Sequence, residues 1–459
     1  MPTDIPLAAH LLRRAGFGAS LDELEAYSAK DYEEIVDDLI HPERLPEIEE
    51  DTLKRYYSTK GGIQARWNHR ILNTHRPLQE KMVLFWHQLF PTSTKKSGHI
   101  LSSFQQIDTF RRFCLTNIRT ILCELSKDPA MIFWLDNNEN LKEAPNENYG
   151  RELLELFSMG VGNYTEEDVK GATSAFTGWT FVTPTPGVAN DRFPAEFKFR
   201  GHSHNDGSKS FLGETARLNG EDIIDVIVRQ PATARFMARH MYTFFVADEP
   251  PVASWNEIPP KDPEAIDTLT KAYFDSEGDL RSILETLFLS DFFKEARFKR
   301  VKSPIELVMG ILKLTGTCQE ESFHNVKRLG AFRVMGQSLL APETVEGWRT
   351  GPEWIDGGKL STRIDFAVGE LSDSTAPGIK NIVYKLSADS PMSPEEFVDK
   401  VLKLAGPVNV NPHTHKTLVQ HAESSGPLDF NGGSSWEKGE QRVVRMLQLI
   451  TSTREYQFG

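Results

Sequence analysis

The chain is poor in cysteine, with only three among its 459 residues. Cys114, Cys123 and Cys318 are odd in number and lack the CxxC spacing of a metal site. Neither a disulfide framework nor a thiolate zinc site is therefore expected. Because Cys114 and Cys123 lie in the apolar helical pattern FCLTNIRTILCEL, we predict that both are buried as small hydrophobic side chains.

Long apolar runs are absent as well. No stretch approaches the roughly 18 uninterrupted apolar residues that a membrane span needs. The N-terminal sequence MPTDIPLAAHLLRRAGFG also lacks a charged region followed by an apolar one. We therefore expect a soluble, cytoplasmic protein with no membrane partner. The net charge of −13 argues against nucleic acid as a partner, since binding to its phosphates draws on an excess of Lys and Arg.

Familiar short motifs of catalysis are missing too. The sequence contains no Walker-type phosphate loop, no GxSxG nucleophile elbow and no HExxH zinc motif. The two helices that carry most of the candidate site residues lack the paired Glu-x-x-His motif of di-iron bundles. With 39% hydrophobic and 25% charged residues, the composition is nevertheless that of an ordinary folded protein.

What is present is a helical pattern along most of the chain. Apolar residues recur at spacings of three and four, which predicts a mainly α fold: a large multi-helix body with a small β-hairpin insertion. Start signals occur at Pro77, at Thr165 with Asp168, and at Ser303-Pro304 before Glu306. Helices are expected at about 76–90, 105–126, 148–159, 166–177, 221–229, 231–245, 263–274, 279–288, 303–315, 395–404 and 437–452.

The length, roughly two to three times that of a usual domain, predicts several segments. We divide the chain into an N-terminal helical segment (1–60), a helical core with the candidate site (61–182), a hairpin insertion (183–220), a second helical half (221–370) and a C-terminal helical region with a flexible loop (371–459). Loops rich in Pro and Gly are expected at 183–188, 247–262 and 405–434.

The insertion contains AEFKFRGHSHNDGSKSFLG, which breaks the helical spacing. Phe197 and Phe199 alternate with charged residues, and Asn205 to Gly207 has the composition of a tight turn. We therefore predict a short hairpin over about 197–212 with its turn at Asn205 to Gly207. If His202 and His204 lie on a strand, they point to the same side, and Asp206 adds a possible third metal ligand; the alternative is a group of turn-forming polar residues.

The densest group of reactive side chains lies in NENYGRELLELFS, residues 146–158. On a helix, Tyr149, Leu153, Leu156 and Gly160 share one stripe, while Asn148, Glu152 and Glu155 share another. Asn146 or Asn148 is expected to cap the start of this helix. The acids have two interpretations. Either Arg151 pairs with Glu155 while Glu152 faces water, or Glu152 and Glu155 face inward as metal ligands or as an acid/base pair.

A second helix, RPLQEKMVLFWHQLF, places Glu80 and His87 on one face, seven residues apart. His87 is either a satisfied core histidine or a ligand. The loop MGQSLLAPETVEGWRTGPEWID carries Trp348 and Trp354, which either pin a long connection to the body or form a binding platform, and we favour pinning.

These stretches, together with HLLRRAGFG, LDNNENLKEAP, GNYTEEDVKGATSAFTGW and VKSPIELV, resemble the bacterial domain of unknown function family 1800, in order from about residue 8 to about 370. The resemblance implies a bacterial source and a large, mostly helical protein, but no known activity. It also implies export in some relatives and a phosphatase-like or sulfatase-like protein as a partner. The positions that match the family pattern are His10, Arg13, Arg14, Glu80, His87, Asn146, Asn148, Arg151, Glu152, Glu155, His204, Asp206 and Lys209.

Two positions depart from this family pattern. Family members often carry a second histidine two residues after His87, where this chain has Leu89. His202 does not correspond to a motif position, which leaves His204 with Asp206. We expect Lys209 to lie beside the two carboxylates of Glu152 and Glu155, because a cation lowers the cost of holding both of them charged.

Two functional interpretations follow. The first is a metal-dependent enzyme, an oxidoreductase or hydrolase that acts on a small molecule or protein. Its metal, iron, manganese or zinc, would be held by Glu80, His87, Glu152, Glu155, His204 and Asp206. Its catalytic residues would be the carboxylates Glu152 and Glu155, with Arg151, Lys209, Asn146 and Asn148 beside them. The second is a non-catalytic binding or assembly partner in which these residues form a buried polar network. On the first, Glu152→Gln is expected to damage function far more than folding.

Overall fold

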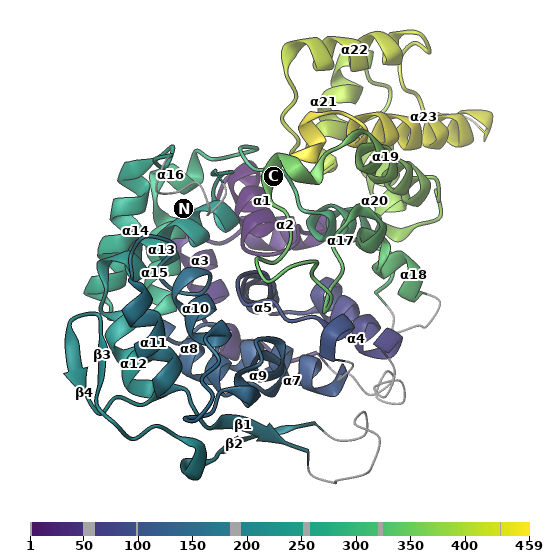
Figure 1. The fold of residues 1–459 in the computed structure, drawn as a ribbon. Coiled ribbons are helices and arrows are strands. Elements are labelled where there is room, and N and C mark those ends of the chain that lie inside the picture. Colours follow the sequence, from purple (N-terminus) through teal and green to yellow (C-terminus); the bar gives the residue numbers. More distant parts are fainter. Residues whose placement is uncertain are drawn as a thin grey trace.

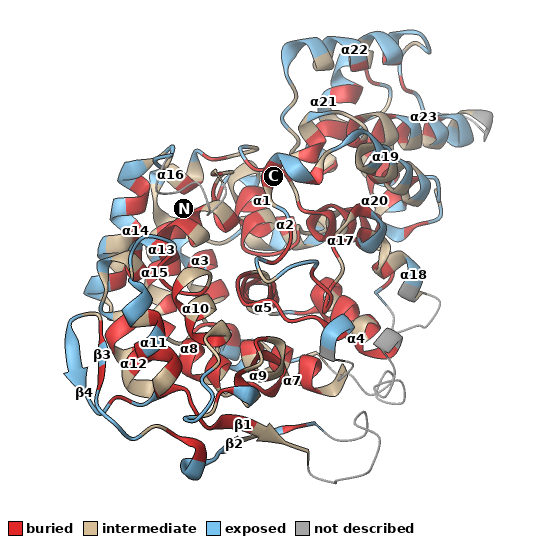
Figure 2. Cartoon of the chain, viewed as in Figure 1, coloured by how far each residue is buried: buried red, intermediate tan, exposed pale blue. Residues whose placement is uncertain are grey.

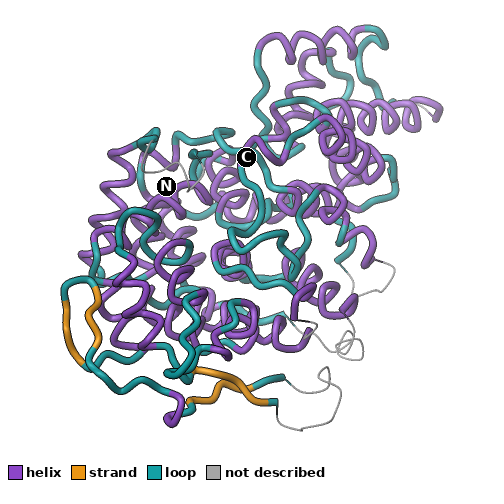
Figure 3. The backbone as a smooth tube through the Cα atoms, viewed as in Figure 1, coloured by secondary structure: helices purple, strands orange, loops and turns teal. Residues whose placement is uncertain are grey.

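The computed structural model describes residues 2–48, 60–97, 100–183, 194–250, 258–319, 325–431 and 433–459. It has the predicted mainly α architecture, a multi-helix body with two small two-stranded sheets (Figures 1 and 3). The predicted loop at 183–188 lies outside these ranges except for residue 183, and so do residues 251–257 of the predicted loop at 247–262.

In Figure 1, most of the first half of the chain, from α4 onward, forms the lower part of the body, whereas α1 and α2 lie higher, near α17. Its helices are α1 (Ile5–Arg14), α2 (Leu21–Ser28), α3 (Tyr32–Ile40), α4 (Lys60–Asn73), α5 (Pro77–Leu89), α6 (Thr94–Ser97), α7 (Ile100–Phe113), α8 (Ile118–Ser126), α9 (Pro129–Trp134), α10 (Asn148–Glu155) and α11 (Glu166–Ala175). The strands that follow are β1 (Trp179–Val182), β2 (Glu196–Phe199), β3 (Lys209–Phe211) and β4 (Glu214–Ala216).

The second half completes the body and adds a helical group that projects from it, α19 to α23, drawn in green to yellow in Figure 1. Its helices are α12 (Gly220–Val228), α13 (Pro231–Phe245), α14 (Pro263–Asp275), α15 (Leu280–Leu289), α16 (Asp291–Lys294), α17 (Pro304–Thr315), α18 (Val326–Leu329), α19 (Gly357–Leu371), α20 (Pro377–Ala388), α21 (Pro394–Leu404), α22 (Pro412–Glu423) and α23 (Gly433–Thr451).

Helix α5 lies at the centre of the body and is buried on all sides (Figure 2). Its apolar side chains, among them Met82, Val83 and Trp86, belong to one continuous core that includes side chains from each of the five predicted segments. A helix that is surrounded by core must also bury its polar residues, and α5 buries Glu80, Lys81 and His87. Each of these three therefore needs a partner from another element.

Local sequence signals account for several helix starts. Thr165 and Asp168 form a capping box at α11, and Ser303 and Glu306 form another at α17, as predicted. Pro77 is the first residue of α5, also as predicted. The three cysteines are buried and unpaired, so the prediction for Cys114 and Cys123 is confirmed.

Two predicted spans were wrong. The helix expected over 105–126 is divided into α7 and α8 at Thr116 and Asn117. The Leu280 N–H donates to the Thr116 carbonyl, and the side chain of Asn117 accepts the N–H of Thr120 to cap α8. The contact with Leu280, which is distant in the sequence, therefore determines where α7 and α8 separate. The loop expected over 405–434 contains α22, which begins with Asn411 as its cap and Pro412 as its first residue.

The insertion contains strands, but its turn is not at Asn205 to Gly207. β1 pairs with β2, and β3 pairs with β4 through a turn at Leu212 and Gly213, whose φ values are 46° and 85°. Positive φ at both central residues is what a tight hairpin turn requires. The side chain of Asn205 instead accepts the N–H of Gly207 and donates to Ser174 of α11. This segment is therefore an Asx turn that docks on a helix.

Within the described residues, no helix is long and apolar enough to cross a membrane. Trp348 and Trp354 are both buried, so the interpretation that they pin their loop to the body is confirmed. The indole N–H of Trp348 donates to the carbonyl of Ser338, 3.2 Å away. The loop from Ser338 to Trp354 is thus held against α5 and the core.

Helix α11 packs against β3 through Gly171, where an added Cβ would collide with the carbonyl oxygen of Ser210. We predict that Gly171→Ala lowers the free energy of unfolding by about 1–3 kcal/mol, despite the higher helix propensity of alanine. Gly369→Ala in α19 is the matched control, because an added Cβ there meets no atom within 4 Å. It should raise stability by about 0.5–1 kcal/mol. Urea denaturation measures both, and equal effects would contradict the close packing.

Candidate functional site

Glu80, the first predicted metal ligand, is held in a buried ion pair. Its carboxylate accepts hydrogen bonds from Arg111 Nε at 2.5 Å and Nη2 at 3.1 Å, and from the indole of Trp67 at 3.1 Å. A guanidinium nitrogen of Arg70 lies 3.9 Å away. Because these groups surround both carboxylate oxygens, Glu80 joins α4, α5 and α7 and does not point into a pocket.

His87, on the same helix, is fully buried between two tryptophans. Its ring lies 5.5 Å from that of Trp67 and 5.1 Å from that of Trp348, and its Nε2 accepts the backbone N–H of Leu340 at 3.1 Å. Nδ1 has no hydrogen-bond partner among the described residues. Burial lowers the pKa of His87 to about 3, so the imidazole is neutral at pH 7. It serves to anchor the Leu340 loop to α5.

Helix α10 carries the predicted carboxylate pair, and the structure corrects its proposed partners. Arg151 pairs with Glu166, at 2.8 Å to each oxygen, and with Glu147 at 3.3 Å, so the predicted pair of Arg151 with Glu155 is wrong. The reason is geometric, because Arg151 faces the start of α11. Glu155 accepts a hydrogen bond from the hydroxyl of Tyr164 at 2.8 Å.

Asn146 lies just before α10 and Asn148 is its first residue, and both make hydrogen bonds at the start of this helix. The side-chain oxygen of Asn146 accepts the N–H of Asn148, and the Asn148 amide donates to the carbonyl of Leu135 at 3.1 Å. The cap position itself is Glu147, without a side-chain hydrogen bond, so neither asparagine is the predicted cap. They connect α10 to the end of α9.

Glu152 is half-buried on α10, and its pKa is raised. Burial is the largest cause, and the neighbouring carboxylates of Glu155 and Glu346 add to it. Glu346 comes from the loop that carries Trp348. The α10 carboxylates are therefore close enough to this loop to share its electrostatic environment.

The insertion residues do not join α10. His204 is buried, and its Nδ1 lies 2.9 Å from the carbonyl oxygen of Thr177, while Asp206 is exposed. The ammonium of Lys209 donates to the carbonyls of Asn205 and Gly207. Burial lowers its pKa, and the carboxylates that oppose this are Asp206 and Asp222. The expectation that Lys209 lies beside the α10 carboxylates is therefore wrong, because its own turn holds it.

Within the part of the chain that the structure describes, no three His, Cys, Asp or Glu side chains are arranged to hold a metal ion. Of the six proposed ligands, Glu152 and Glu155 share one helix, whereas Glu80, His87 and His204 each have other partners. The six proposed ligands, all of which the structure describes, are therefore not gathered into the predicted metal centre.

Glu155 instead lines a pocket of about 490 Å³, which we call the acidic pocket. It lies between α5, α10, α13 and the Trp348 loop. Its carboxylates are those of Glu155, Asp248, Glu249, Glu343, Glu346 and Glu353, and its guanidinium groups are those of Arg300 and Arg349. The carboxylates thus outnumber the cations in its wall.

Aromatic side chains form the deeper part of the acidic pocket. Phe85, Phe244 and Trp348 line it, and all three are buried. His240 also lines it, and burial lowers the pKa of His240 to about 3, so its imidazole adds no positive charge at pH 7. The pocket therefore combines apolar surface with negative charge.

Most of these wall residues cannot be predicted from the sequence. No local spacing links Asp248 and Glu249, at the end of α13, with Arg300, which lies before α17. Glu343, Glu346 and Glu353 all lie in the loop MGQSLLAPETVEGWRTGPEWID, near Trp348 and Trp354. Three acids around a buried tryptophan are the one local signal of this pocket.

A sequence model for the family described as "Protein of unknown function (DUF1800)" matches residues 10–458, nearly the whole chain. No curated protein and no solved structure matches the chain.

The buried, neutral state of His87 predicts a pH dependence of stability. Its pKa is about 3 in the folded protein, below the ordinary value near 6.5, so the unfolded chain binds more protons between these values. Stability should therefore fall as the pH decreases from about 6.5 towards 3, by up to about 1.4 kcal/mol per pH unit for this one group. Urea denaturation at a series of pH values measures the slope.

His87→Gln tests whether His87 contributes to that slope. The variant keeps an acceptor for the Leu340 N–H but does not titrate, so its stability should depend less steeply on pH below 6.5. His202→Gln, at an exposed position, is the matched control and should keep the wild-type slope. Identical slopes in the wild type and His87→Gln would contradict the assignment of a neutral, buried imidazole.

Proposed function

The chain belongs to the family DUF1800 of proteins of unknown function, and we propose that it binds a small amine-bearing ligand in the acidic pocket. The observation that carries this proposal is the excess of carboxylates over guanidinium groups in the pocket wall. The volume of about 490 Å³ falls within the usual range for small-molecule sites. The sequence instead predicted, as its second interpretation, a binding or assembly partner with a buried polar network, and of the predicted site residues only Glu155 lines this pocket.

Some charged groups of the wall are paired with residues outside it. Arg300 donates to Glu306 at 2.9 and 2.8 Å, and Arg239 lies 3.9 Å from Glu249. Burial nevertheless raises the pKa of Glu249, and it also raises the pKa of Glu152, which lies beside the pocket on α10 and does not line it. A positively charged ligand would favour the ionised form of such carboxylates.

The aromatic wall suits a ligand with an apolar part. Phe85, Phe244 and Trp348 supply apolar surface to the pocket. The carboxylates are distributed around the pocket and do not converge, which suits a ligand of several atoms better than a single ion. We therefore infer an amine attached to an apolar or aromatic group.

A metal-dependent enzyme is the second candidate. The observation that favours it is that the carboxylates of Glu155 and Glu346 contribute to the raised pKa of Glu152. Carboxylates that lie close together are also what a divalent cation requires. Iron, manganese or zinc would then bind at α10. Elemental analysis of the purified protein distinguishes the two: stoichiometric metal that is lost in a Glu152→Gln, Glu155→Gln double variant would replace the amine proposal.

Benzylamine, benzyl alcohol and benzoate provide a set of probes with one ring and three charge states. We predict that benzylamine binds most tightly in isothermal titration calorimetry, because only it places a cation among the carboxylates. Glu155→Gln should weaken its binding by about tenfold with little change in melting temperature. Tyr164→Phe is the control, since it removes the hydroxyl that donates to Glu155 and keeps the charge. Equal binding of all three probes would overturn the proposal.

Glu152→Gln tests the role of the other carboxylate of α10, which lies beside Glu155. The pKa of Glu152 is raised in the folded protein, so its ionisation opposes folding at pH values above its ordinary pKa. The variant should therefore melt at the same or a slightly higher temperature at pH 7, and should bind benzylamine more weakly than the wild type. A marked loss of stability with unchanged benzylamine affinity and metal content would instead identify Glu152 as a structural residue.

A further inference from the structure

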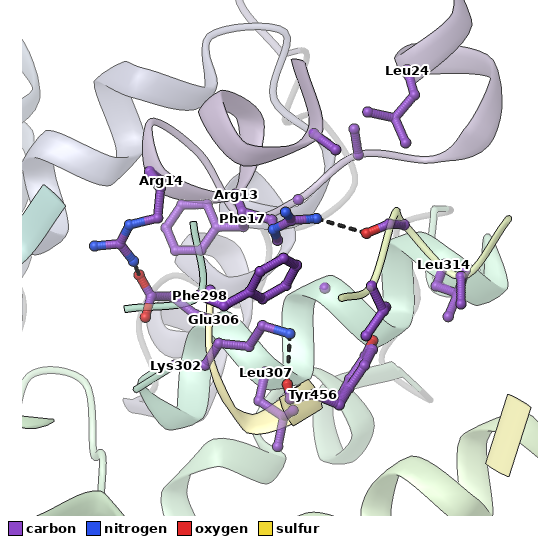
Figure 4. Close-up of a pocket in the computed structure, with 18 of the residues that line it drawn as sticks. Arg13, Arg14, Phe17, Leu24, Phe298, Lys302, Glu306, Leu307, Leu314 and Tyr456 are labelled. Carbon is purple, nitrogen blue, oxygen red and sulfur yellow. Dashed lines mark hydrogen bonds and ion pairs between the residues drawn. The ribbon is translucent and has the colours of Figure 1, made fainter. Parts of the chain in front are cut away.

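A second pocket, which we call the basic pocket, lies where α1 meets α17 and the C-terminal residues. Its volume is about 60 Å³, and its charged wall residues are Arg13, Arg14, Lys302 and Glu306. In Figure 4, Arg13 and Arg14 come from α1, the guanidinium group of Arg14 points toward Glu306, and Lys302 points toward the segment that carries Tyr456. None of these groups belongs to the wall of the acidic pocket.

Glu306 is the one side-chain carboxylate among the described residues that line the basic pocket, and the main-chain carboxyl group of Gly459 also lies there, beside Lys302 and Arg14. Glu306 accepts hydrogen bonds from Lys81 and from Arg300, and Arg14 lies 3.8 Å from it. Burial alone would raise the pKa of Glu306, but Arg300, Lys81 and Arg14 hold it well below its ordinary value. Its one negative charge is thus shared by three cations, and two of these do not line the pocket.

The remaining cations donate to neutral acceptors. Arg13 donates to the carbonyl of Gly406 at 2.7 Å, and Lys302 donates to that of Tyr456 at 2.7 Å. These acceptors carry no net charge, and the other close contacts of the two cations are with rings, since Arg13 lies 4.9 Å from the ring centre of Phe298 and Lys302 lies 3.9 Å from that of Tyr456. Burial and the charge of Arg13 lower the pKa of Lys302 well below its ordinary value, and a bound anion would oppose this shift. The Nε of Arg13 is buried and has no hydrogen-bond partner among the described residues.

We propose that the basic pocket binds a small tetrahedral oxyanion, with inorganic phosphate as its simplest form. Arg13 and Lys302 would donate to it from opposite sides, and Arg14 would face it beside Glu306. A volume of about 60 Å³ holds roughly four or five water molecules. This space suits one phosphate-sized group. Guanidinium and ammonium groups in a buried setting are the donors that such anions prefer.

This site is separate from the proposed amine site in charge and in residues. The two are connected by one ion pair, because Arg300 lines the acidic pocket and its partner Glu306 lines the basic pocket. Phosphate binding can therefore be tested independently of the amine proposal, and Glu155→Gln should leave it unchanged.

The experiment is equilibrium dialysis of the full chain against radiolabelled inorganic phosphate, with thermal melting in phosphate and in chloride at equal ionic strength. The wild type should bind about one phosphate per chain and melt at a higher temperature in phosphate. Lys302→Met should weaken binding by about ten- to a hundredfold and abolish the difference in melting temperature.

Lys294→Met is the matched control. Lys294 lies 5.2 Å from the ring centre of Tyr32, much as Lys302 lies 3.9 Å from that of Tyr456, but Lys294 is outside the basic pocket. It should bind phosphate like the wild type. If Lys302→Met does not fold, Arg13→Gln decides, because Arg13 is partly exposed and donates to the backbone carbonyl of Gly406, so its replacement leaves no carboxylate without a partner.

Two results would overturn the proposal. One is the absence of saturable phosphate binding in the wild type at millimolar concentrations. The other is equal binding by the wild type, Lys294→Met and the folded basic-pocket variant, which would mean that phosphate acts through general ionic effects and that the buried cations serve only to hold the backbone carbonyls of Gly406 and Tyr456.

Discussion

The buried carboxylate of Glu306 is the interaction on which the centre of this structure depends. It accepts from Lys81 of α5 and from Arg300, and Arg14 of α1 lies close by. Arg14 also donates to the carbonyls of Phe244 and Phe245 at the end of α13. One carboxylate therefore joins four parts of the chain, and removing it would leave buried cations, a loss that typically costs about 3–5 kcal/mol.

This network also separates two environments of opposite charge. Arg300 faces the acidic pocket, and Glu306 faces the basic pocket, so their ion pair forms part of the wall between them. The charges on the two sides still interact, because Asp248 of the acidic pocket raises the pKa of Arg14 of the basic pocket. Each pocket is nevertheless left with a charge that a ligand of opposite sign could match, which is why both proposals concern binding.

The polar residues of α5 show how far a sequence pattern can identify a site. The shared face of Glu80 and His87 was apparent from their spacing, yet the two side chains meet different partners: Arg111 and Trp67 for one, and Leu340 for the other. Spacing determines which side of a helix a residue occupies. It does not determine whether that side meets a pocket, an arginine or an indole, because these come from distant segments.

The sequence by itself determined the mainly α class, the family and the caps of α11 and α17, because these depend on neighbours within a few residues or on whole motifs. Only the tertiary structure decided that Lys209 folds back on its own turn, that α7 and α8 separate where Leu280 pairs with Thr116, and that the acids near Trp348 approach α10. The physical reason is that a buried polar group must be satisfied by whatever the fold brings to it, and that partner lies far away in the chain.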